Sequence, residues 1–120
     1  MVDSSAVDTP LDTLLGRTAA KLLLYLLHHG EAYATGVAKD LSIPQSAVQR
    51  QLEKLEAEGF LVSKRIGRTR LYTFNPKSPA TGKLREFVGV FYDGMPLRER
   101  ERMFATRRRP RRRGKPVKGE

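Results

Sequence analysis

The sequence predicts a mostly helical α+β fold, in which three helices precede a β-hairpin and a further helix follows it. Two observations support this fold class. Apolar residues recur at helical spacing through residues 9–58 and again through residues 79–91. Between these regions, residues 60–74 contain two short segments rich in β-branched and aromatic side chains, on either side of Gly67. A chain of 120 residues has room for one such domain.

The first predicted helix begins at Pro10 and ends before Gly30. Thr9 is a candidate cap for this helix, and Asp12 stands where the carboxylate of a capping box reaches back. Apolar residues then recur at spacings of three and four, and further leucines flank them, so the apolar arc is wide. The inward positions are Leu15, Ala19, Leu22 and Leu26. We therefore expect a helix that the rest of the domain surrounds.

A helix-turn-helix pattern occupies residues 35–58. A short helix runs from Thr35 to Leu41, and Pro44 ends it because the residue before a proline is biased away from helical dihedrals. A second helix starts at Pro44 and runs to about Glu58, where Gly59 stops it. The inward residues are Val37, Ala38 and Leu41 in the first helix, and Val48, Leu52 and Leu55 in the second.

Residues 60–65 and 70–74 are expected to pair as a hairpin around Gly67. Residues 31–34 are too few for more than one further bridge to this sheet. The last main helix opens near Pro79 and carries an apolar stripe of Leu84, Phe87, Val88 and Phe91. After an interruption at Gly94-Met95-Pro96, residues 97–105 are expected to form one or two further helical turns.

Positive charge is concentrated near the C-terminus. The formal net charge is +10, of which residues 107–120 contribute +7. This composition buries no core, so we expect a disordered basic tail over residues 106–120, and a flexible leader over residues 1–8. The tail is either a solvated segment or an arm that binds phosphates of DNA, RNA or a membrane, and we expect non-specific DNA binding. Its arginines are Arg107, Arg108, Arg109, Arg111, Arg112 and Arg113.

Several functional classes are not expected. The absence of cysteine excludes disulfides, thiol catalysis and thiolate metal sites. The chain has no glycine-rich phosphate loop and no recognisable catalytic constellation, so we expect neither an enzyme nor a cofactor. Adjacent His28 and His29 point about 100° apart on a helix, which favours a structural role over metal binding. The longest apolar run, residues 22–27, is too short to span a membrane, and a cytoplasmic location is expected.

The second helix of the helix-turn-helix pattern has a polar outer face. This face carries Gln45, Ser46, Gln49 and Arg50 on its first two turns, with Lys54 further along. These side chains suit base edges and phosphates, while Glu53, Glu56 and Glu58 fall toward the C-terminal end. Because most surface helices have a polar face, this feature alone favours DNA only weakly.

The predicted hairpin strengthens the case for DNA. It carries Lys64, Arg65, Arg68 and Arg70, and no acidic residue lies between Glu58 and Arg85. A solvated hairpin more often mixes charges of both signs. A basic tip beside a polar helix is suited to lie along phosphates, or to insert Arg68 into the minor groove.

Residues 11–76 resemble the winged helix-turn-helix domains of bacterial and archaeal regulators of the ArsR and MarR type. The resemblance rests on VAKDLSIPQSAVQRQL (37–52), LEAEGFL (55–61) and GRTRLY (67–72). It implies that Gln45, Ser46, Gln49 and Arg50 read the groove and that Arg65 and Arg68 are wing contacts. It also implies dimerisation through terminal helices, on the stripe of Leu84, Phe87, Val88 and Phe91. The alternative is that this stripe packs within the chain.

The expected organisation is a leader (1–8), a winged helix-turn-helix (9–76) with a three-helix core, a dimerising helical segment (77–105) and a basic tail (106–120). The expected function is a homodimeric, sequence-specific regulator of transcription that binds double-stranded DNA at the nucleoid, and by analogy a repressor. Helix 44–58 is expected to read the major groove, and wing 63–70 to contact the backbone or minor groove. The alternative is a winged-helix accessory or protein-interaction module whose tail binds nucleic acid non-specifically.

Overall fold

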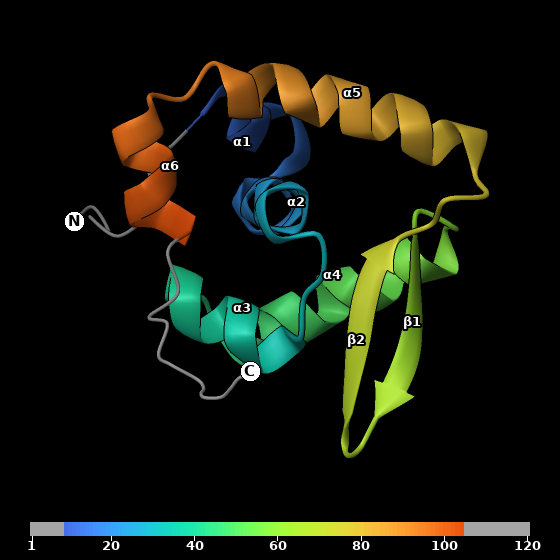
Figure 1. The fold of residues 1–120 in the computed structure, drawn as a ribbon. Helices are drawn as coiled ribbons and strands as arrows, with labels where there is room; N and C mark the ends of the chain where they lie inside the picture. Colours follow the sequence, from blue (N-terminus) through green and yellow to red (C-terminus); the bar gives the residue numbers. More distant parts are fainter. Residues whose placement is uncertain (1–8, 105–120) are drawn as a thin grey trace, which may run out of the picture.

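The computed structural model describes residues 9–104, which fold into helices around one central helix and a projecting hairpin (Figure 1). In chain order the elements are α1 (Pro10–Leu15), α2 (Arg17–His29), α3 (Ala34–Leu41), α4 (Gln45–Ala57), β1 (Leu61–Ile66), β2 (Thr69–Phe74), α5 (Pro79–Asp93) and α6 (Leu97–Phe104). The predicted fold class, a mostly helical winged helix-turn-helix followed by a further helix, is confirmed. The leader 1–8 and the basic tail with its six arginines lie outside the described residues.

The core is built around α2. Residues 20–26 of this helix are all buried, so the helix is covered on every side. Figure 1 shows α5 crossing one side of α2, with α3 and α4 on the other. The wide apolar arc predicted from the sequence is therefore confirmed, except that Leu15 at its start is exposed.

The single helix predicted from Pro10 to His29 is wrong, because the chain breaks at Gly16. This residue has φ +90°, a conformation that favours glycine. The predicted capping box is also wrong, since the Thr9 side chain caps no backbone N–H. Asp12 instead accepts two hydrogen bonds from the ammonium of Lys21, at 2.8 and 3.0 Å. This pair joins α1 to α2 and neutralises a fully buried lysine.

The helix-turn-helix follows the predicted pattern. Ser42 has φ +58° and makes the turn between α3 and α4. Helix α3 starts at Ala34, one residue before the expected cap Thr35. In α4, Val48 and Leu52 are buried against the core. The chain leaves α4 through Gly59, whose φ of +90° allows the reversal into β1.

The hairpin is antiparallel, and its register places Ser63 opposite Tyr72 and Arg65 opposite Arg70. The connection between α2 and α3 adds one bridge, as predicted. In this bridge the N–H of Ala32 donates to the carbonyl of Tyr72 at 3.0 Å, and the reverse bond is 2.9 Å long. Tyr72 is therefore held by strand pairing on both sides, and its side chain is buried.

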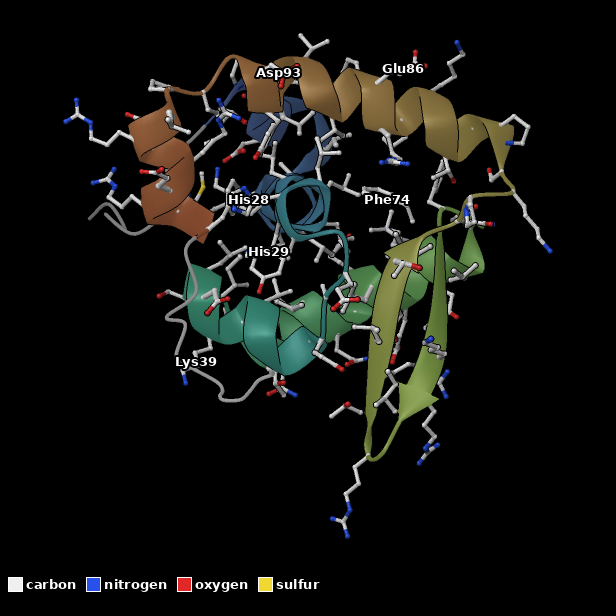
Figure 2. The ribbon with its side chains drawn as sticks, in the orientation of Figure 1. His28, His29, Lys39, Phe74, Glu86 and Asp93 are labelled. Atoms are coloured by element: carbon white, nitrogen blue, oxygen red, sulfur yellow. The ribbon has the colours of Figure 1, made fainter. Side chains whose placement is uncertain are left out.

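Helix α6 returns to the core, which the charged sequence of residues 97–105 did not predict. Phe104 is fully buried, with its ring 5.2 Å from that of His28 and 6.3 Å from that of Tyr25. His28 Nδ1 lies 2.8 Å from the Tyr92 hydroxyl, and His29 Nε2 donates to the Phe104 carbonyl at 2.8 Å. Figure 2 shows both histidines on α2. These contacts agree with the structural role expected of the pair.

The apolar stripe of α5 is divided between the core and the surface. Val88 is fully buried within the chain, so the expectation that it contacts a second copy is corrected. Leu84 and Phe91 are partly buried against the same core. Phe87 is 43% exposed, and the neighbouring Val90 is 67% exposed.

Two negative observations concern residues 9–104 alone. None of the helices there has both the length and the apolar character to cross a membrane. That part of the chain also contains no group of three His, Asp or Glu side chains placed to hold a metal ion.

We predict that Phe104→Ala lowers the free energy of unfolding by about 3–5 kcal/mol, because it removes a fully buried ring from the core. Leu97→Ala is the matched control on the same helix. Leu97 is 62% exposed, and its truncation is expected to cost less than about 0.5 kcal/mol. Urea denaturation of the two variants measures both values, and equal losses would show that α6 is not part of the core.

A second prediction concerns pH. Burial lowers the pKa of His28 below its usual 6.5, and the positive charges of His29 and Arg100 lower it further. The folded state therefore disfavours protonated His28, so its contribution to stability is complete above about pH 6.5 and decreases as the pH falls below it. We expect urea denaturation between pH 7.5 and 5.5 to show a smaller loss of stability for His28→Gln than for the wild type. Parallel pH profiles would contradict this prediction.

Candidate nucleic-acid interface

A cavity of about 370 Å³ lies between α4 and the hairpin, which we call the wing. One wall comes from α4 and the start of α3, and the other from the wing. The wall residues used below are Gln45, Gln49, Glu53, Glu56, Arg65, Arg68, Arg70 and Tyr72. The wing projects beyond α4 (Figure 1), so its tip and the start of α4 face the same side of the molecule.

Helix α4 presents two adjacent polar stripes because Val48 and Leu52 occupy its inner side. One stripe, with Gln45 and Gln49, borders the cavity. The other lies one residue further round the helix and consists of Ser46, Arg50 and Lys54, all exposed. All five residues predicted for this helix are therefore on its polar side, with Gln49 partly covered by the wing.

The wing separates the four basic residues that the sequence grouped together. Alternate residues of a strand point to opposite faces of the sheet. Arg65 and Arg70 therefore share the face of the buried Tyr72, toward α4, and Arg68 lies at the tip. Lys64 points to the other face, where it borders a second cavity with Glu31.

Arg65 and Arg70 lie directly opposite each other on the two strands, an arrangement that is destabilising for like charges. Arg70 donates to the hydroxyl of Ser63 at 3.2 Å, and this hydroxyl donates to Glu56 at 2.7 Å. Within residues 9–104, no carboxylate lies within 4.0 Å of the guanidinium groups of Arg65, Arg68 or Arg70. The three arginines thus form a basic cluster without a direct ion pair, which suits a phosphate backbone.

Several residues of the cavity were not predicted as site residues from the sequence, among them Glu53 and Tyr72, which contact Gln49. Gln49 Nε2 donates to Glu53 Oε2 at 2.8 Å and to the hydroxyl of Tyr72 at 3.3 Å. Burial raises the pKa of Tyr72, so this hydroxyl keeps its proton to a higher pH than an exposed tyrosine does. Glu53 lies one helical turn after Gln49, and Tyr72 lies two strand positions after Arg70. Both spacings are visible in the sequence, but the contact between helix and wing is not.

Comparison with solved structures finds the same fold in other proteins. The chain is similar to reduced HlyU from Vibrio cholerae N16961, with a TM-score of 0.55 and 22% identity over 68% of this chain and 83% of HlyU. It is also similar to a MarR-family transcriptional regulator from Rhodococcus sp. RHA1, with a TM-score of 0.54 and 19% identity over 73% of this chain and 68% of that one. At such identities the similarity shows the fold alone. A comparison with curated proteins found no match.

A protein-family model matches residues 15–79, which is more than half of the chain. The model is described as the sugar-specific transcriptional regulator TrmB. The matched range contains α2, α3, α4 and the wing, and therefore both walls of the cavity. The winged helix-turn-helix regulator predicted from the sequence is confirmed, and the family model names TrmB where the sequence pattern resembled the ArsR and MarR types. The chain belongs to the TrmB family of transcriptional regulators.

Proposed function

We propose that this DNA-binding regulator recognises a specific double-stranded sequence and that α4 and the wing bind it together. The observation that carries the proposal is the placement of Arg65, Arg68 and Arg70, which face the polar side of α4 without a carboxylate partner in residues 9–104. A major groove is wide enough for one helix, and the wing would then lie on the adjacent backbone or minor groove.

The proposed contacts divide by chemistry. Gln45, Ser46, Gln49 and Arg50 lie on the first two turns of α4, and as a group they offer the donors and acceptors that read base edges. Lys54 lies further along the helix and is suited to a phosphate. The wing arginines contact phosphates or the minor groove, which positions the protein without reading most of the sequence.

We further propose a homodimer. Phe87 and Val90 expose apolar surface on α5, and Leu14 on the neighbouring α1 is 62% exposed. Burial of this surface against a second copy would remove apolar area from water and present two copies of α4 to a symmetric site. Repression is the proposed outcome, because occupancy of a site by a dimer is enough to obstruct transcription. A protein acting in this way would be located in the cytoplasm, at the nucleoid.

The basic segment that begins at Arg107 is proposed to add sequence-independent affinity. Its first arginine follows Phe104, the last residue of α6, by three residues in the sequence. Helix α6 packs beside α3, the first helix of the helix-turn-helix (Figure 1).

Selection of genomic fragments at physiological salt tests the proposal, using the full chain and a chain that ends at Ala105. We expect both forms to recover the same two-fold symmetric site, with higher affinity for the full chain. Recovery of bulk DNA alone, lost with the tail, would contradict sequence-specific recognition. It would favour the alternative of an accessory or protein-interaction module.

The wing gives a sharper prediction. Arg68→Ala and Arg70→Ala are expected to weaken binding evenly across sequences, and each to reduce the slope of log K against log salt by about 0.9. Lys64→Ala removes the same charge from the opposite face of the wing and is the matched control. Fluorescence anisotropy at several salt concentrations measures both quantities. An effect of Lys64→Ala as large as that of Arg70→Ala would rule out the proposed orientation of the wing.

A further inference from the structure

Both amide hydrogens of Gln49 are engaged by other side chains of the protein. Its Nε2 donates to the carboxylate of Glu53 at 2.8 Å and to the hydroxyl of Tyr72 at 3.3 Å. A carboxylate only accepts hydrogen bonds, so the NH₂ group of Gln49 must be the end that faces Glu53. Since an amide NH₂ has two hydrogens, these two bonds use its whole donor capacity, and the carbonyl oxygen remains available as an acceptor.

The Tyr72 side of this arrangement is rigid. Tyr72 is 1% exposed, and its backbone is paired with Ala32 on one side and with β1 on the other. A buried hydroxyl that loses its hydrogen-bond partner is destabilised, and Gln49 is the side chain that reaches this hydroxyl among the described residues. Withdrawal of Gln49 toward DNA would therefore leave a buried polar group of the wing without this partner.

Glu53 is the one of the two carboxylates on the cavity wall of α4 that accepts a hydrogen bond from Gln49. Of the two carboxylates on the cavity wall of α4, Glu56 accepts from Ser63 and so belongs to the wing network. Glu53 accepts from Gln49, one helical turn before it. Arg50, on the neighbouring stripe, is exposed.

We propose that Glu53 and Tyr72 are positioning residues that make Gln49 an acceptor-only reader of the major groove, selecting adenine or cytosine over guanine or thymine at the position it faces. This inference rests on the proposed function, since it requires α4 to enter the groove. Adenine and cytosine present an amino group at the major-groove edge, whereas guanine and thymine present only acceptors there. A glutamine with unengaged hydrogens holds adenine with two bonds and so prefers it to cytosine. An acceptor-only glutamine makes one bond to either base.

The test uses the site recovered by the full chain. The position read by Gln49 is the one at which Gln49→Ala loses base discrimination, and affinities are then measured for all four base pairs there. For the wild type we expect adenine and cytosine to bind within about twofold of each other, and each about fivefold or more tighter than guanine and thymine. In the double variant Glu53→Ala/Tyr72→Phe, we expect adenine to be preferred to cytosine by about fivefold.

Two controls separate positioning from other effects. Glu58→Ala removes an exposed carboxylate from the end of α4 that does not contact Gln49, so it is expected to raise affinity for all sequences evenly and leave the adenine-to-cytosine ratio unchanged. Glu53→Ala alone changes an exposed residue and supplies the same readout if the double variant does not fold. In this single variant the adenine-to-cytosine ratio is expected to increase.

The outcomes distinguish this inference from the function on which it rests. Selective binding in which the wild type prefers guanine or thymine at this position would overturn the inference alone. The same conclusion follows if the adenine-to-cytosine ratio is equal in the wild type and in both Glu53 variants, or if Gln49→Ala alters no position. Failure of every form to select a sequence would overturn the proposed function itself.

Discussion

The complete burial of α2 is the constraint on which the other elements depend. A helix with seven consecutive buried residues requires neighbours on all sides. Here α1 and α5 cover one side of α2, α3 and α4 cover the opposite side, and α6 lies between α5 and α3. The inward residues of α4, Val48 and Leu52, belong to this cover. Their burial fixes the rotation of α4 about its axis and therefore turns its polar side outward. The proposed reading face is thus a consequence of core packing and not of the polar residues themselves.

Tyr72 connects this core to the wing. Its backbone pairs with the segment before α3 and with β1, and its hydroxyl meets a side chain of α4. Tyr72 thus connects the wing, α4 and the segment before α3, which would have to move together on DNA. A hairpin attached only by its two ends would place its arginines at variable distances from α4. Fixed placement lowers the conformational entropy that is lost when both parts bind one ligand.

Elements that depend on local periodicity could be predicted from the sequence, whereas contacts between distant segments could not. The turn at Ser42, the polar stripes of α4 and the hairpin around Gly67 follow from spacing and turn chemistry. The break at Gly16 is stabilised by Lys21, which lies nine residues from Asp12, and periodicity gives no sign of that pair. Strand alternation alone places Lys64 and Arg65 on opposite faces, but which face meets α4 depends on the packing of distant segments. The burial of Phe104 depends on aromatic residues of α2 and α5.

Sequence changes before and after Phe104 have different consequences for the protein. Loss of a single codon within α6 would rotate Phe104 by about 100° away from His28 and expose the core. Insertions, deletions and charge changes beyond Phe104 alter the basic segment while leaving the core contacts of α6 in place. Under the proposed function, the strength of non-specific attraction to DNA would therefore be open to selection independently of folding, and the boundary between the two properties would fall within three residues of sequence.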